Sequence, residues 1–141
     1  MPTVNEIMST DVKLVEPGAT LRCAAQLMQQ LDVGALPVCR GNVLLGMVTD
    51  RDIVVRGLAA GLAPDTALVS DVMTDALQFC TADQDTEEVL RTMGDAQVRR
   101  LPVVNLDKEL VGIVSIGDLA RRQAGHIDQT MRAISEPTAS L

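Results

Sequence analysis

Apolar and polar positions along the chain form one pattern that occurs twice. In the first copy, two short apolar runs at residues 36–39 and 43–48 flank a polar turn at residues 40–42, which predicts a β-hairpin. Before it, apolar residues recur at helical spacing from Thr20 to about Leu31, and Thr20 is a suitable N-cap. Residues 12–15 predict a further strand, and residues 53–60 a second helix that ends at Gly61.

The second copy follows at an offset of 65 residues, which becomes 66 after its hairpin turn. It predicts a strand at residues 77–81, a hairpin from 101–104 to 110–115, and a helix capped by Asp85 with Glu88 in capping-box position. The one extra residue falls in a turn, where insertions are tolerated. We therefore expect a mixed α/β (α+β) fold of two repeats, each strand–helix–strand–strand–helix, packed with pseudo-twofold symmetry. Each repeat alone is too small to bury much surface.

The predicted boundaries are residues 1–61 for the first repeat, 62–68 for a linker and 69–123 for the second repeat, all in one compact module. Residues 124–141 form a C-terminal helix and tail. In this segment Ile127, Met131 and Ile134 have the i, i+4, i+7 spacing of an amphipathic helix. The first copy has no counterpart, so we expect this stripe to cap the module or to contact a second subunit.

Composition narrows the classes of partner. The net charge of −7 opposes general attraction to nucleic acid or to anionic lipid. A single Phe, with no Tyr or Trp, also argues against binding by base stacking. The apolar runs are too short to span a membrane, and the first residues lack the pattern of a secretory signal. Three cysteines without a CxxC motif fit a reducing compartment, so we expect a cytoplasmic protein with all three thiols buried.

Catalytic and metal-binding motifs are absent from the sequence. It contains no P-loop and no GxGxxG fingerprint, and the only histidine, His126, lies in the tail, far from a cysteine that could act as nucleophile. The scattered cysteines lack zinc-ligand spacing. We therefore expect no enzyme activity, no metal site and no required cofactor.

The candidate chemistry lies in a hydroxyl residue placed three positions before an aspartate, once in each copy. These pairs are Thr49 with Asp52 and Ser115 with Asp118. A carboxylate at a helix start can accept from both hydroxyls of a ribose, and the hydroxyl with the free N–H groups of the helix start suits a phosphate. Each pair is equally compatible with a plain helix cap.

The chain resembles a tandem pair of CBS domains, a Bateman module, over roughly residues 4–123. The likeness rests on Leu36-Pro37-Val38 followed by Gly46 to Asp52, and on Leu101-Pro102-Val103 followed by Gly112 to Asp118. Within the family the chain is most similar to the small stand-alone bacterial pairs of the hypoxic-response-protein type. The resemblance implies a non-catalytic regulatory module with two clefts for AMP, ADP, ATP, S-adenosylmethionine or NAD. It also implies a homodimer and a regulated partner protein of unknown identity.

The resemblance further implies that each cleft joins the hydroxyl/aspartate pair of one repeat to wall residues of the other. Cleft A would contain Ser115, Asp118, Arg99, Arg100, Ile113, Met8, Asp11, Lys13 and Val33. Cleft B would contain Thr49, Asp52, Arg51, Gly34, Met73, Ala76, Gln78 and Val98.

The two clefts differ in charge. Where the second copy has Arg99-Arg100, the first has Gly34-Ala35. A phosphate chain needs a cation in a protein of net charge −7, so we rank cleft A above cleft B for a phosphorylated ligand. Cleft B would stay empty or take a less charged ligand such as S-adenosylmethionine. The arginines could instead be a solvated surface pair, and the competing interpretation of the whole chain is a structural or protein-interaction module without a nucleotide ligand.

Overall fold

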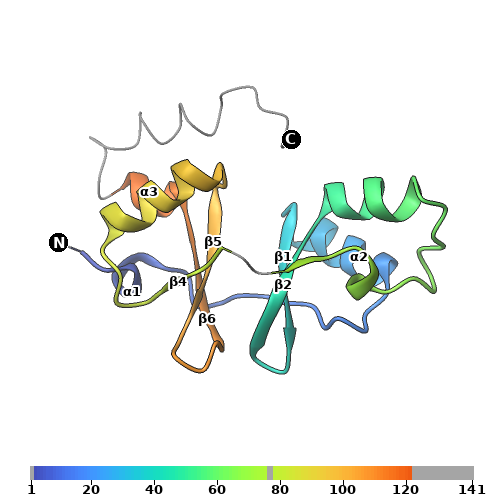
Figure 1. Cartoon of the computed structure of the whole chain (residues 1–141), viewed down its shortest axis with the longest axis horizontal. Coiled ribbons are helices and arrows are strands. Elements are labelled where there is room, and N and C mark those ends of the chain that lie inside the picture. Colours follow the sequence, from blue (N-terminus) through green and yellow to red (C-terminus); the bar gives the residue numbers. More distant parts are fainter. Residues whose placement is uncertain (1, 76–77, 122–141) are drawn as a thin grey trace. The chain divides into compact units, whose positions relative to one another are not determined.

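Two three-stranded sheets, one in each of two units, correspond to the two predicted repeats (Figure 1). The structure is a computed structural model that describes residues 2–75 and 78–121. Within this part of the chain, unit 1 comprises residues 2–12, 78–107 and 111–121, and unit 2 comprises residues 13–75 and 108–110. The predicted mixed α/β fold is confirmed.

Unit 2 contains the first hairpin and the helices around it. Its elements are α2 (Leu21–Leu31), β1 (Ala35–Arg40), β2 (Val43–Thr49), η1 (Asp52–Leu58), η2 (Val69–Asp71) and β3 (Thr74–Asp75). The sheet has the order β1-β2-β3 with antiparallel pairing throughout. The helix predicted from Thr20 to about Leu31 and the predicted hairpin are confirmed to within one residue. The strand predicted at residues 12–15 is wrong, because only Val15 pairs, through an isolated bridge to Val38.

The helix predicted at residues 53–60 is present as η1, but it is wider than an α-helix. The N–H of Ala59 donates to the carbonyl of Val54 and that of Leu62 to Gly57, both over five residues. Gly57 also lies against the helix α2: a Cβ added there would be 2.8 Å from Leu21 Cδ1. The turn after η1 ends at Gly61 with φ of +83°, a conformation that favours glycine.

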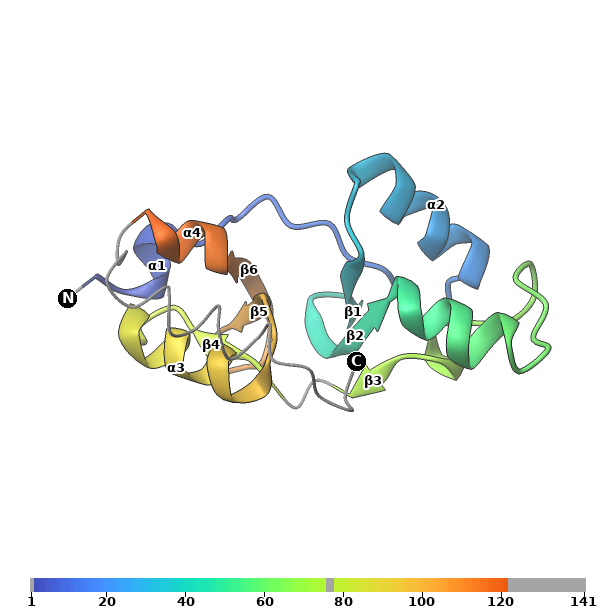
Figure 2. The same cartoon turned by 90° about the horizontal axis from the view of Figure 1, so that it is seen from above.

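Unit 1 contains the second hairpin. Its elements are α1 (Val4–Ile7), β4 (Cys80–Thr81), α3 (Thr86–Ala96), β5 (Arg100–Val104), β6 (Leu110–Ser115) and α4 (Ile116–Ala120). Strand β6 has the predicted bounds and runs directly into α4 (Figure 2). Strand β4, parallel to β5, is shorter than the run predicted at residues 77–81. The predicted capping box of α3 is replaced by two other contacts: Asp85 accepts from the Glu87 N–H, and Glu88 from the Gln84 amide.

The units are not the two halves of the sequence, because the N-terminal segment joins the second repeat. Val4 is fully buried in the unit 1 core with Leu101 and Val114. Its N–H donates to Gln84, and Ser9 forms a bridge with Ile113 of β6. Apolar contacts made by α1 therefore hold the start of the chain on the second repeat's sheet.

The cysteine prediction is only partly right. Cys39 and Cys80 are buried in the cores, but Cys23 is exposed on α2. Burial raises the pKa of the Cys39 thiol to about 11, with a smaller contribution from Glu16, and raises that of Cys80 to about 12. Both thiols are therefore neutral at physiological pH.

The predicted C-terminal stripe of Ile127, Met131 and Ile134 lies outside the described residues. Among the helices that the structure does describe, none is long and apolar enough to cross a membrane.

Candidate functional site

Each hydroxyl/aspartate pair forms a reciprocal cap at the start of the helix that follows the hairpin. In unit 1 the Ser115 hydroxyl accepts from the Asp118 N–H at 3.1 Å, and Asp118 Oδ2 accepts from the Ser115 N–H at 3.0 Å. In unit 2 the same two bonds join Thr49 and Asp52 at 3.0 Å and 2.9 Å. The plain-cap interpretation is thus satisfied in both units. Each cap uses one carboxylate oxygen, Oδ2, and fixes the direction of the side chain.

The backbone N–H groups at these helix starts are largely engaged, contrary to our expectation that they would be free for a phosphate. In unit 1 the Ile116 N–H donates to Arg99 and the Asp118 N–H to Ser115. In unit 2 the N–H groups of residues 50, 51 and 52 donate to protein acceptors. A phosphate at the unit 2 helix start would therefore have to be held by side chains, and at the unit 1 helix start few backbone donors are left for it.

Gly34 and Arg99 occupy corresponding places in the two units. The Gly34 carbonyl accepts from the Asp50 N–H at 2.9 Å, and the Arg99 carbonyl accepts from the Ile116 N–H at 2.9 Å. A Cβ added to Gly34 would lie 3.1 Å from Asp50 Oδ2. The backbone next to the helix start therefore faces a carboxylate in unit 2, whereas in unit 1 it carries an arginine.

A further arginine, which the sequence interpretation missed, lies at the unit 1 pair. Arg121 Nη2 donates to Asp118 Oδ1 at 2.9 Å, and the Arg121 side chain is 77% exposed against 19% for Asp118. Its signal in the sequence was the spacing of three residues after an aspartate in a helix, which brings two side chains to one face. The corresponding residue of unit 2 is Val55.

The charges around the two pairs therefore have opposite balance. In unit 1, Arg121 donates to the carboxylate of Asp118, Arg99 accepts from the start of α4 through its carbonyl, and Arg100 follows it as the first residue of β5. Unit 2 has one arginine, Arg51, with the carboxylates of Asp50 and Asp52. Among these residues, arginines outnumber carboxylates next to the unit 1 pair, and carboxylates outnumber arginines next to the unit 2 pair.

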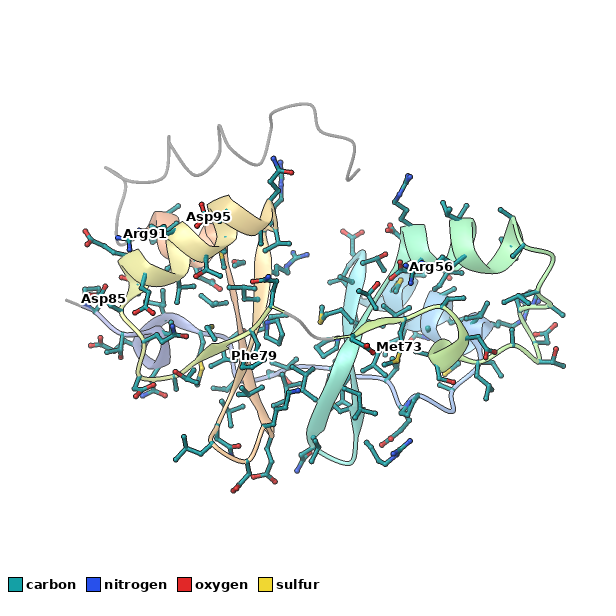
Figure 3. The ribbon with its side chains drawn as sticks, in the orientation of Figure 1. Arg56, Met73, Phe79, Asp85, Arg91 and Asp95 are labelled. Atoms are coloured by element: carbon teal, nitrogen blue, oxygen red, sulfur yellow. The ribbon has the colours of Figure 1, made fainter. Side chains whose placement is uncertain are left out.

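In each unit, a methionine side chain packs against a glycine in the second strand of the hairpin. A Cβ on Gly112 would be 2.6 Å from Met8 Sδ, and one on Gly46 would be 2.9 Å from Met73 Cε. Met73 is held further by Arg56, whose guanidinium donates to the carbonyls of Val72 and Met73 (Figure 3). Met8 and Met73 are thus placed on the same sheets as the hydroxyl/aspartate pairs.

The structure divides the predicted cleft residues between the units. Unit 1 brings together seven residues of cleft A: Ser115, Asp118, Arg99, Arg100, Ile113, Met8 and Asp11; Lys13 and Val33 belong to unit 2. Unit 2 brings together five residues of cleft B: Thr49, Asp52, Arg51, Gly34 and Met73; Gln78 and Val98 belong to unit 1, and Ala76 lies outside the described residues.

A surface hollow in unit 1, which sequence interpretation did not predict, lies between β4 and the start of α3. Its lining is Phe79, Cys80, Thr81, Asp83, Gln84, Asp85 and Glu88, and Figure 3 marks Phe79 and Asp85. Three carboxylates make it unsuited to a phosphate. Across residues 2–75 and 78–121, no three His, Cys, Asp or Glu side chains are grouped so that they could hold a metal ion.

Comparison with known proteins identifies the family. The model of the CBS domain matches residues 4–58 and 69–125. The chain is 44% identical to Hypoxic response protein 1 of Mycobacterium tuberculosis over 141 residues, which are 99% of this chain and 98% of that protein. A crystal structure of Hypoxic Response Protein I with two coordinated zinc ions superposes with a TM-score of 0.78 at 44% identity, covering 85% of this chain and 98% of the other. CBSX2 in complex with AMP superposes with a TM-score of 0.76 at 27% identity, covering 89% and 98%. The two matched segments are the two repeats built around Thr49–Asp52 and Ser115–Asp118, and the chain belongs to the CBS domain family, with two copies of the domain.

Proposed function

We propose that this CBS pair is a non-catalytic regulatory module that binds an adenosine-containing ligand, AMP, ADP or ATP, at the Ser115–Asp118 pair. The observation that carries the proposal is Arg121 on the Asp118 carboxylate, with Arg99 and Arg100 at the start of the neighbouring strand β5, in a chain of net charge −7. The planar guanidinium presents paired donors that match phosphate oxygens. A structural neighbour, CBSX2, is known in complex with AMP.

The capped geometry suits the ribose part of such a ligand. Because Oδ2 of Asp118 is taken by the Ser115 N–H, Oδ1 is the oxygen that a ribose hydroxyl would approach. The Ser115 hydroxyl accepts one bond in the cap and still has its own proton to donate. Both side chains are fixed before a ligand arrives, which lowers the entropic cost of binding.

The rest of the proposal follows the family resemblance. Lys13 and Val33 would complete cleft A, and cleft B would stay empty or bind S-adenosylmethionine, because its acidic pair disfavours phosphate. Ligand binding would shift the equilibrium between packings of the two repeats and so change a surface seen by a partner protein. The pseudo-twofold packing, the cytoplasmic location and the homodimer also remain predictions.

Zinc is not part of the proposal, although the related Hypoxic Response Protein I has been crystallised with two zinc ions. Burial disfavours the thiolate form of Cys39 and Cys80, which zinc binds, by raising their pKa values, and among residues 2–75 and 78–121 no three His, Cys, Asp or Glu side chains are grouped for a metal ion.

A second candidate function is a protein-interaction module without a nucleotide ligand. Its support is an apolar face on η1, where Val54, Val55 and Leu58 are 54%, 48% and 51% exposed. An exposed apolar face of this kind often marks a contact with another protein, here a second copy or a regulated partner.

Thermal denaturation with AMP, ADP, ATP, S-adenosylmethionine and NAD separates the two functions. A ligand at 100 times its Kd should raise the free energy of unfolding by about 2.7 kcal/mol. Stabilisation by the phosphorylated ligands supports the sensor. If none of the five compounds stabilises the protein, the nucleotide proposal fails and the interaction module is favoured.

A further inference from the structure

Both oxygens of the Asp118 carboxylate have a partner in the structure. Oδ2 accepts from the Ser115 N–H, and Oδ1 accepts from Arg121 Nη2 at 2.9 Å. The ion pair therefore uses the oxygen that the helix cap leaves open, which is the oxygen required for ribose under the proposed function. A ribose hydroxyl that binds Asp118 therefore competes with Arg121 for Oδ1.

The ion pair between Arg121 and Asp118 has no counterpart in unit 2. Unit 2 has the same cap on Asp52, but the residue three positions further on is Val55, 48% exposed and uncharged. The helix cap is complete in unit 2 without a cation at that place, so cap formation does not account for Arg121.

We propose that Arg121 is the specificity-determining residue of the Ser115–Asp118 site, and that it makes the site select phosphorylated over unphosphorylated adenosine ligands. Without a ligand, the guanidinium neutralises the carboxylate. When ribose hydroxyls take Oδ1, Arg121 is displaced and its donors turn to the ligand's phosphate. This inference rests on the proposed nucleotide function and adds a residue that the family resemblance did not supply.

The exposure of the two partners makes such an exchange feasible. Arg121 is 77% exposed, so its head group can leave the carboxylate for solvent or for a phosphate without losing buried contacts. Exposed ion pairs are weak, so breaking one costs little. A phosphate offers a stronger, two-point contact to the same guanidinium. Both ligands gain the ribose contact with Asp118, but only AMP gives the displaced guanidinium a new partner; adenosine leaves it without one.

Arg121→Gln therefore has opposite expected effects on two ligands. The variant has no ion pair to break, so adenosine should bind as tightly as before or up to about fivefold more tightly. AMP loses a phosphate contact and should bind about tenfold more weakly. The ratio of AMP to adenosine affinity should fall by about tenfold or more, and Arg121→Lys should restore part of it because the charge is kept.

The experiment is calorimetric titration of the full chain with AMP and with adenosine, for wild type, both Arg121 variants and Arg91→Gln. Arg91 is an exposed arginine on α3 of the same unit and serves as the matched control (Figure 3). A fall in the affinity ratio for Arg121→Gln alone supports the proposal. An unchanged ratio, or equal weakening of both ligands, overturns it while leaving nucleotide binding intact. Wild type that binds neither AMP nor adenosine overturns both this inference and the proposed function.

Discussion

Units 1 and 2 have the same backbone frame but opposite charge at the same place. Both contain a capped aspartate after the hairpin, a methionine on a strand glycine, and a helix that ends in a non-glycine residue of left-handed conformation, Asp32 or Gln97. They differ in the charged side chains beside the capped aspartate, which take no part in forming the cap. The comparison teaches that the hydroxyl/aspartate motif identifies the frame, whereas the arginines beside it decide which ligand charge the frame can accept.

The strand glycines provide the largest expected effect and test how alike the frames are. A Cβ on Gly46 would lie 2.3 Å from the backbone oxygen of Thr74, whereas one on Gly112 would lie 2.6 Å from the flexible Met8 sulfur and 2.9 Å from the backbone oxygen of Ser9. Gly46→Ala should therefore lower the free energy of unfolding by about 2–4 kcal/mol, and Gly112→Ala by about 1–2 kcal/mol, since methionine adapts. Urea denaturation measures both. Equal losses would contradict the view that the closer backbone contact, at Thr74, makes Gly46 the stricter position.

The second prediction concerns the two arginines, Arg99 and Arg100, that unit 2 lacks at the corresponding positions. Replacing Arg99 and Arg100 together by Gln should weaken AMP binding about tenfold and ATP binding about 30-fold, because charge-assisted hydrogen bonds to phosphate are lost. Arg51→Gln, beside the pair in unit 2, is the matched control and should leave both affinities unchanged. Fluorescence or calorimetric titration gives the values. A larger loss for Arg51→Gln than for the double variant would assign the phosphate to unit 2.

The smallest expected effect concerns an ion pair confined to unit 2. Arg22 of α2 donates to Asp65, and this hydrogen bond, with the attraction between the charges, lowers the pKa of Asp65 and raises that of Arg22. The corresponding residue of unit 1 is Glu87. Because the pKa of Asp65 is lower in the folded state, the pair stabilises the fold above the unfolded pKa of about 3.9, and this contribution is lost as pH falls through the folded value. Asp65→Asn should melt slightly below wild type at pH 7 and together with it in acid. A difference that persists in acid would contradict this origin.

The repeat, the helix α2 and both hairpins could be predicted because local patterns decide them. Strand β6 was predicted with its observed bounds, since its apolar run is flanked by a polar turn and by the capping serine. The assignment of residues 2–9 to unit 1 could not be predicted from a local pattern, because it depends on burial of Val4 in the core of the other repeat. The exposure of Cys23 likewise depends on which face of α2 is packed.

The candidate site was predicted at the level of residue types, whereas its contacts were not. Thr49, Asp52, Ser115 and Asp118 follow from the motif, and the repeat offset places Arg99 opposite Gly34. The N–H groups at the helix starts are partly engaged by carbonyls from the residues before each hairpin, Gly34 and Arg99. These bonds join residues far apart in the sequence, so a local pattern does not predict them. The pair between Arg121 and Asp118 depends on a side-chain conformation, which residue spacing permits but does not fix.

Calorimetric titration of AMP into Asp118→Asn and Asp52→Asn tests the central claim, that unit 1 holds the nucleotide, most directly. Asparagine keeps an oxygen for the helix cap, so folding is preserved while the carboxylate is lost. We predict that Asp118→Asn weakens AMP binding by about 30-fold and that Asp52→Asn leaves it within about twofold of wild type. The opposite order would contradict the account and place the nucleotide at unit 2.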